Sequence, residues 1–142
     1  MADPEFDSAK EFRTVIDEIF TMMSEDPVMG PKLRDADVPQ RFEFTDLDLV
    51  VNIRATRDDE DGNLAWEWTD DVDWEPTVRM TMSSETANKY FQGKENVAMA
   101  IARRRIKTGG DVKAALSLIP ITKPVYPRYR ALVEAEYPHL KA

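Results

Sequence analysis

The stretch VRMTMSSETANKYFQGKENVAMAIARRRIKTGGDVKAALSLIP, residues 78–120, contains the clearest structural signals in this sequence. Its first five residues alternate apolar and polar side chains, a period of two that predicts a strand with one buried face. Ser83 or Ser84 then provides a helix cap, and Gly93 supplies the stop. This half of the stretch is therefore predicted to be a strand followed by a short helix.

The second half of the stretch places a basic cluster between two further helices. We predict a short helix over residues 95–101, and we expect the basic segment that follows, residues 102–108, to be extended. Gly110 and Asp111 open another helix, which Pro120 closes. The predicted order over the whole stretch is thus strand, helix, helix, strand and helix.

Helices are also predicted on both sides of this stretch. Ser8 and Glu11 form an S-x-x-E capping box, and apolar residues at helical spacing then run to about Ser24. Prolines and a glycine leave at most a short helical piece around residues 28–35. A last helix is expected after Pro127.

Further strands are predicted upstream of residue 78. Residues 41–55 form one run of alternating side chains with a phase shift at Thr45 and Asp46, which indicates a bulge or bend within a strand. After an acidic turn, Trp66 and Trp68 lie on one face of a second strand. Because these strands share an apolar face, we predict an antiparallel meander covered by helices, in a domain of the α+β class.

The composition is that of a globular protein and excludes several classes. The 142 residues carry a net charge of -8, and no apolar run approaches the ~18 residues that a membrane helix needs. Residues 1–6 read as a cloning scar, so we assign one domain to residues 7–142 and infer no signal peptide. The absence of cysteine excludes disulfides and fits a cytoplasmic location. The excess of acidic residues argues against a nucleic-acid partner.

The order of elements over residues 78–120 resembles the sterol-carrier-protein family, and residues 123–137 are similar to the tail of its bacterial branch. The matching features are a strand ending in a Met-Ser step, a helix ending in aromatic-x-Gly-Lys, a small-residue helix, a basic Ile-Lys segment and an Ala/Leu helix after a Gly turn. The resemblance implies an α+β fold in which an antiparallel or mixed five-stranded sheet, covered by helices, encloses an apolar lipid tunnel. It also implies non-enzymatic binding of sterol, fatty acid or acyl-CoA, with no cofactor or metal and with transient membrane contact.

The candidate ligand-binding residues lie on the apolar sheet face and on the helices expected around the tunnel. Methionine suits such a lining because a flexible thioether repacks around ligands of different shape, although plain core packing is the alternative for each. The two strand tryptophans are either both buried, near a ligand, or both exposed as a contact patch. The full set is Phe44, Leu49, Val51, Trp66, Trp68, Met80, Met82, Phe91, Met99, Arg104, Ile106 and Leu116.

The basic cluster raises a separate question. If it is extended, Arg103, Arg105 and Lys107 share a solvent face toward the acidic turns, and Arg104 falls on the buried face with Ile106. The family commonly has a small residue, usually Gly, near this position. A buried guanidinium must be paired, so one hypothesis is that Arg104 binds the carboxylate or phosphate head of an acyl ligand. The alternatives are a bulge that turns Arg104 outward, or a stem that reaches the rim and pairs with an acidic residue.

Two other classes of function are open. In the first, the sheet face is filled by its own side chains and the chain is an accessory domain that docks to an enzyme of lipid or aromatic catabolism. The second class is a small-cavity enzyme such as a steroid isomerase. Such an enzyme needs a carboxylate in an apolar pocket, and Asp46 and Asp48 are the candidates.

The acidic runs 58–61 and 70–73 read as solvated turns, with weak calcium binding as the alternative. His139, the one histidine, reads as a solvated terminal side chain.

Overall fold

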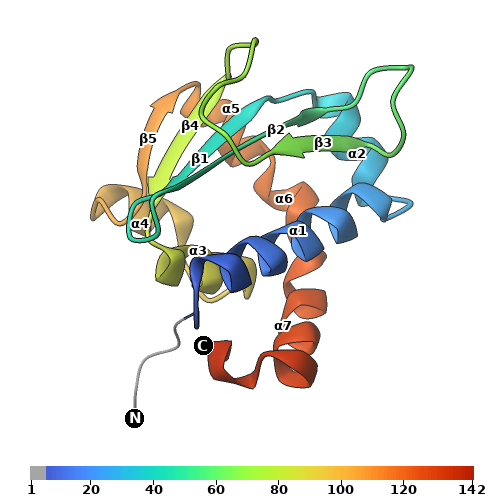
Figure 1. Ribbon diagram of the computed structural model, residues 1–142. Coiled ribbons are helices and arrows are strands. Elements are labelled where there is room, and N and C mark those ends of the chain that lie inside the picture. Colours follow the sequence, from blue (N-terminus) through green and yellow to red (C-terminus); the bar gives the residue numbers. More distant parts are fainter. Residues whose placement is uncertain (1–5) are drawn as a thin grey trace.

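A computed structural model describes residues 6–142, and its centre is one five-stranded sheet (Figure 1). The sheet order is β3-β2-β1-β4-β5. The neighbours β1 and β4 run parallel, and the other three pairs are antiparallel, so the sheet is mixed. The strand bounds are β1 (Gln40–Phe44), β2 (Leu49–Ala55), β3 (Leu64–Glu67), β4 (Val78–Met82) and β5 (Lys107–Gly110). The predicted α+β class with a five-stranded antiparallel or mixed sheet is confirmed. The predicted antiparallel meander is wrong, because β4 lies parallel beside β1 and not beside β3. The predicted scar falls mainly on residues 1–5, outside the described residues.

Helices cover one face of this sheet, and Figure 1 shows α1 between the sheet and α7. None of the helices that residues 6–142 form is long and apolar enough to cross a membrane. The helix bounds are α1 (Ala9–Glu25), α2 (Met29–Ala36), α3 (Ser84–Phe91), α4 (Val97–Ala102), α5 (Val112–Ser117), α6 (Ile119–Thr122) and α7 (Val125–Glu136), followed by the 3-10 turn η1 (Pro138–Leu140).

Helix α1 begins where the capping box predicts. The Ser8 side chain accepts a hydrogen bond from the Glu11 N–H at 3.1 Å, while the Glu11 carboxylate accepts one from the Asp7 N–H. The apolar residues at helical spacing are all buried, from Phe12 to Met23. This stripe is the largest helical contribution to the core.

The phase shift at Thr45 and Asp46 is a hairpin turn, which corrects the predicted bend within one strand. The strands β1 and β2 pair antiparallel, with Phe44 opposite Leu49. Asp48 closes the turn in a left-handed conformation, at φ 53°. Since residues directly opposite each other in a ladder share a face, the shifted phase keeps the apolar side chains of both strands on the helix side.

The basic cluster is not an extended strand, which corrects a second prediction. Helix α4 continues to Ala102, and the N–H groups of Arg105 and Ile106 donate back to the carbonyl of Ala100. Arg104 is the left-handed residue of this helix end, at φ 61°. A left-handed residue that lets the chain leave a helix is usually glycine, which gives a physical reason for the family preference at this position. Strand β5 begins only at Lys107.

Two prolines begin helices rather than ending or preceding them. Pro120 lies in the first turn of α6, although we predicted that it would close the preceding helix. Pro127 lies in the first turn of α7, which starts two residues before it. Proline is tolerated there because the first-turn N–H groups have no partner within the helix.

Buried amides join α3 to the C-terminal elements. The Tyr129 hydroxyl donates to Asn88 Oδ1 at 2.7 Å, and the side chains of Asn88 and Gln92 both donate to the Leu140 carbonyl at 2.8 Å. Each of these groups is nearly fully buried. Because a buried polar group without a partner destabilises the fold, these hydrogen bonds are needed to offset the loss of hydration. They fix α7 and η1 against α3.

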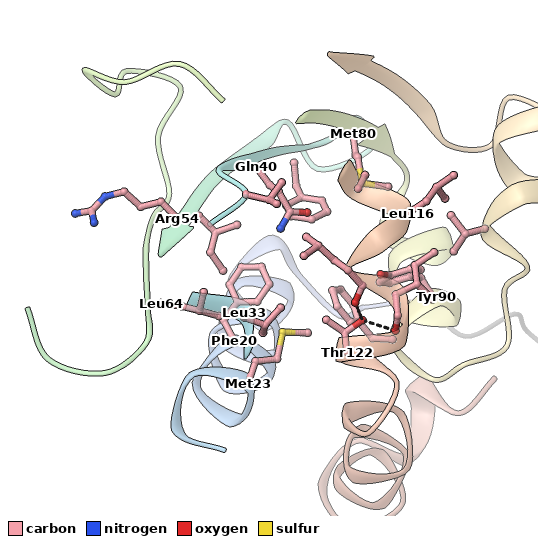
Figure 2. A pocket seen from close by; sticks show the side chains of 18 of the residues that line it. Phe20, Met23, Leu33, Gln40, Arg54, Leu64, Met80, Tyr90, Leu116 and Thr122 are labelled. Carbon is pink, nitrogen blue, oxygen red and sulfur yellow. Dashed lines mark hydrogen bonds between the residues drawn. The ribbon is translucent and has the colours of Figure 1, made fainter. Parts of the chain in front are cut away.

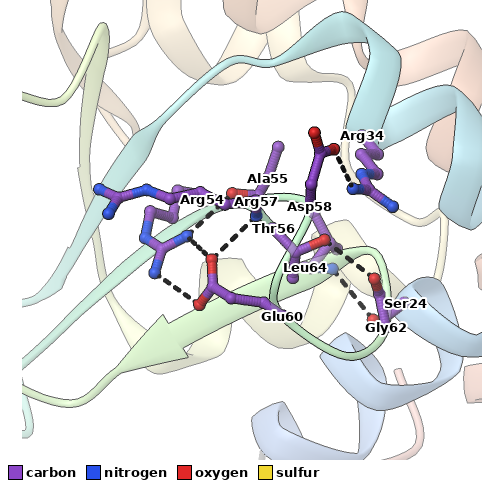
Figure 3. A network of polar contacts seen from close by, with 10 residues as sticks. All are labelled: Ser24, Arg34, Arg54, Ala55, Thr56, Arg57, Asp58, Glu60, Gly62 and Leu64. Atoms are coloured by element: carbon purple, nitrogen blue, oxygen red, sulfur yellow. Dashed lines mark hydrogen bonds and ion pairs between the residues drawn. The ribbon is translucent and has the colours of Figure 1, made fainter.

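The acidic turn between β2 and β3 is held by polar contacts (Figure 3). Glu60 forms a two-pronged ion pair with Arg54, at 2.7 and 2.9 Å, and accepts from the Arg57 N–H. The hydrogen bonds from these arginine residues lower the pKa of Glu60 to about 2. Ser24 Oγ of α1 accepts from the N–H groups of Asn63 and Leu64. The turn is therefore anchored by Arg54, Arg57 and α1, whereas we expected a solvated loop without such contacts.

Candidate functional site

The helix-facing side of the sheet is divided into two halves. The closed half consists of Phe44, Leu49, Val51, Trp68 and Met82, and the cavity half consists of Gln40, Phe42, Ile53, Leu64 and Met80. The registers place these residues in successive rows across the strands, all on the same face.

The closed half is filled by aromatic packing against the start of α1. The Phe12 ring makes an edge contact with Phe44 at 4.5 Å between centroids, and a second with Trp68 at 6.3 Å. Phe12, Phe44 and Val51 are at most 2% exposed. Edge-to-face contacts of this kind add to the free energy of area burial, so this half forms a dense core.

The cavity half encloses an apolar cavity of about 50 Å³ (Figure 2). Strand residues form its floor, and its walls come from α1, α2, α3, α4, α5 and α6. The helical residues that line it are Phe20, Met23, Leu33, Tyr90, Phe91, Val97, Ile101, Ala115, Leu116, Leu118, Ile119 and Thr122.

Three residues of the predicted ligand-binding set line this cavity: Met80, Phe91 and Leu116. The other nine lie elsewhere. Ile106 is fully buried beside the helix end, and Met99 is 43% exposed. Phe44, Leu49, Val51, Met82 and Trp68 belong to the closed half, and Trp66 stacks edge-on against Phe20 without lining the cavity.

Cavity residues that the sequence pattern missed lie on the strands beside predicted residues, or come from the covering helices. Phe42 and Ile53 show the same alternation as the predicted residues, so this signal was present. Gln40 was missed because it is polar, although it lies on the same face. Leu118 and Ile119 carry no periodic signal, because Leu118 lies between α5 and α6 and these helices have only six and four residues.

The two strand tryptophans are neither fully buried nor an exposed patch. Trp66 and Trp68 are half-buried, and both indole N–H groups donate to Asp17 Oδ1, at 3.0 and 2.7 Å. They share a face as predicted. Their role in the structure is to fix the outer strand β3 to the middle of α1.

Arg104 lies outside the cavity, which corrects the hypothesis that it reaches a ligand head group there. Its side chain is exposed and lines an open surface hollow together with Lys94 and Lys107. Arg105 is paired with Glu95 at 2.6 Å rather than with the acidic turns. The helix end at Ala102 turns these arginines outward, because Ile106 takes the buried position.

Polar side chains along the cavity are few and neutral. Gln40, Thr108, Tyr90 and Thr122 contribute them, and the Thr122 hydroxyl already donates to the backbone carbonyls of Leu118 and Ile119. Burial raises the pKa of the Tyr90 hydroxyl well above its usual range, so this group stays protonated. Arg54 also borders the cavity, but Figure 2 shows its guanidinium directed away.

The two carboxylates considered for catalysis lie on the surface. Asp46 caps α3, accepting from the Ser84 N–H at 2.8 Å and from the Ser84 hydroxyl. Asp48 is exposed in the β1–β2 turn. Neither lies in an apolar pocket, which is the environment that an isomerase base requires.

His139 is not a free terminal side chain, contrary to our expectation. Its Nε2 lies 2.7 Å from Glu11 Oε1 and 3.8 Å from Asp7 Oδ2. The hydrogen bond to Glu11 raises the pKa of His139. The ligand atoms of these three residues lie within 4.8 Å of one another, a spacing that a cation would fit, but they already form the contact between α1 and η1.

Comparisons with known proteins agree with this architecture. A sequence profile of the SCP-2 sterol transfer family matches residues 20–123. No match was found among curated protein sequences. The solved structure of sterol carrier protein 2 from Yarrowia lipolytica, in its apo form, is 14% identical, with a TM-score of 0.58 over 87% of this chain and 97% of that chain.

Two further solved structures share the fold. The UbiJ-SCP2 ubiquinone synthesis protein is 7% identical, with a TM-score of 0.60 over 85% of this chain and 95% of that one. A double mutant of the sec-alkyl sulfatase PisA1 is 17% identical, with a TM-score of 0.61 over 74% of this chain. This chain spans only 16% of the sulfatase's length.

Proposed function

This chain belongs to the SCP-2 sterol transfer family, and we propose that it binds and carries an apolar lipid in the cavity half of its sheet without catalysing a reaction. The observation that carries this proposal is the apolar cavity between the sheet and the short helices. Its lining comes from all five strands, so any bound molecule would contact the fold's centre rather than its surface.

The energy of binding would come from apolar area. Each buried methylene contributes about 0.8 kcal/mol, so a sixteen-carbon chain would gain roughly 12 kcal/mol before ordering costs are subtracted. A cavity of about 50 Å³ holds only a few water-sized spheres, so a lipid needs the covering helices to move outward. Helices α5 and α6 are suited to this movement, because each buries a single side chain, Ala115 and Thr122.

We place the access route for lipid at α5 and α6, where the cavity and an outer groove share lining residues. Val97, Leu116 and Ile119 line the cavity and also an outer groove bordered by Lys123 and Tyr126. A single layer of side chains therefore separates the cavity from solvent at this place, and Leu116 is already 39% exposed. Displacement of this layer would join groove and cavity into one tunnel.

The lining supports a carrier over an enzyme. Among the described residues, the side chains that line the cavity include no carboxylate, histidine or lysine. These are the side chains that most often serve general acid–base catalysis. The Tyr90 hydroxyl also lines the cavity, but burial raises its pKa and keeps it from acting as a base. We extend the proposal to a cytoplasmic carrier that contacts membranes transiently and has no nucleic-acid partner.

Native mass spectrometry of the purified protein, followed by organic extraction, tests the proposal. We expect a mass shift that corresponds to one bound lipid, either carried from expression or acquired on incubation with a long-chain alcohol or sterol. A protein that stays ligand-free with every apolar lipid offered would contradict lipid carriage.

A second candidate function is an accessory domain that docks to an enzyme. Two observations favour it: the fold matches a small part of the sec-alkyl sulfatase chain, and the cavity is small. In that case the sheet face would remain filled by its own side chains. Lipid-free protein in the mass spectrum, together with unchanged tryptophan fluorescence on lipid addition, would favour this function.

A further inference from the structure

We infer that the cavity selects neutral lipids with one small hydrogen-bonding group, and that the side-chain amide of Gln40 is the residue that binds this group. The inference rests on the proposed lipid-carrying function and adds the chemical class of the ligand. It depends on where Gln40 lies, on what surrounds it and on the charges around the cavity.

Gln40 is a polar residue in an apolar row. It opens β1 between Ile53 of β2 and Val78 of β4, on the face that lines the cavity. Figure 2 shows this side chain directed toward the other side chains that line the cavity. The Gln40 side chain is partly exposed, and within residues 6–142 its amide has no hydrogen-bond partner in the protein. An amide offers two donors and an acceptor, so it can bind a hydroxyl or a carbonyl oxygen equally well.

The charges around the cavity exclude a carboxylate as the preferred group. Of the described residues that line it, Arg54 alone is charged, and its guanidinium is turned outward and paired with Glu60. The basic cluster lies on the outer surface, with Arg104 exposed. A carboxylate beside Gln40 would therefore lose its hydration without gaining a cation, a cost that a hydroxyl or carbonyl avoids.

The test compares three ligands with the same twelve-carbon chain: dodecane, 1-dodecanol and dodecanoate, at pH 8. For the unmodified protein we expect 1-dodecanol to bind at least about tenfold more tightly than dodecanoate. The variant Gln40→Met keeps the length of the side chain and removes its amide. It should weaken 1-dodecanol binding about tenfold, the ratio expected for one lost hydrogen bond, and leave dodecane binding within about twofold.

Thr108→Val is the matched control, because Thr108 is a second strand residue with a neutral polar side chain that lines the cavity. It should leave the preference for the alcohol unchanged. Equal loss of dodecane and 1-dodecanol in Gln40→Met would overturn the inference, as would tighter binding of dodecanoate by the unmodified protein. If none of the three ligands binds, the proposed function itself fails, so the two failures are distinguishable.

Discussion

The closed half and the cavity half of the sheet are built from the same strands and the same alternation, yet one is solid and the other is hollow. Met80 and Met82 show the contrast most clearly, since they are two residues apart on one face of β4. Met80 lines the cavity and Met82 does not. The difference therefore comes from what covers the sheet rather than from the sheet.

The covering helices differ in length and in the area they bury. Helix α1 has 17 residues and a continuous buried stripe, of which Phe12 fills the closed half. Helices α5 and α6 have six and four residues, too few to be stable without tertiary contacts. The cavity half is covered partly by Phe20 and Met23 of α1 and partly by these short elements, so we expect it to open at the short helices, whereas the closed half has no such cover.

Loss of a closed-half side chain should have the largest effect. Phe44→Ala removes a ring that is 2% exposed and packs against Phe12, so we expect the free energy of unfolding to fall by about 3–5 kcal/mol in urea denaturation. Leu116→Ala on the cavity half should cost less than about 1 kcal/mol, because its side chain is 39% exposed. Similar losses at both positions would remove the distinction between the halves.

Filling the cavity should affect binding more than stability. Ala115 is the buried residue of α5 and lines the cavity, so Ala115→Trp places an indole where the lipid is proposed to lie. We expect lipid affinity to fall at least about tenfold, measured by calorimetric titration with 1-dodecanol.

Ala131→Trp is the control for this substitution, since Ala131 is exposed on α7. It adds the same side chain away from the cavity and should bind 1-dodecanol normally. Unchanged affinity in Ala115→Trp would show that the lipid binds somewhere else.

The smallest effect is expected at the contact between α1 and η1, remote from both halves. The hydrogen bond to Glu11 raises the pKa of His139 above 6.5. Partial burial raises the pKa of Glu11, but the hydrogen bonds from His139 and Asp7 lower it by more. The net result is a pKa below 4.5. The stabilisation due to His139 is present below pH 6.5 and is lost as pH rises through its raised pKa. That due to Glu11 is present above pH 4.5 and is lost as pH falls.

The pair therefore stabilises the protein most between pH 4.5 and 6.5. His139→Ala should lower the free energy of unfolding by less than about 1 kcal/mol at pH 6, and the difference from the unmodified protein should disappear at pH 9. A loss that is the same at both pH values would indicate packing rather than an ion pair.

Local chemistry made the fold predictable, but it could not locate the cavity. The Ser8 cap, the helix stop at Gly93 and the alternation through Met82 depend on near neighbours, so the sequence determined them. The basic cluster was placed wrongly because a left-handed arginine is rare, and glycine is what normally signals such a helix end. The division of the sheet face depends on which distant helix covers each strand residue, since Val51 and Met80 share a row but fall in different halves. The alternation of residues within a strand carries no information about that cover.

Nuclear magnetic resonance of the methionine methyl groups during titration with 1-dodecanol tests the central claim most directly. The cavity-lining Met80 and Met23 should shift strongly as one equivalent of ligand binds, while Met82 of the closed half stays in place. A shift at Met82 with none at Met80, or equal shifts at both, would contradict the account that only one half of the sheet opens to lipid.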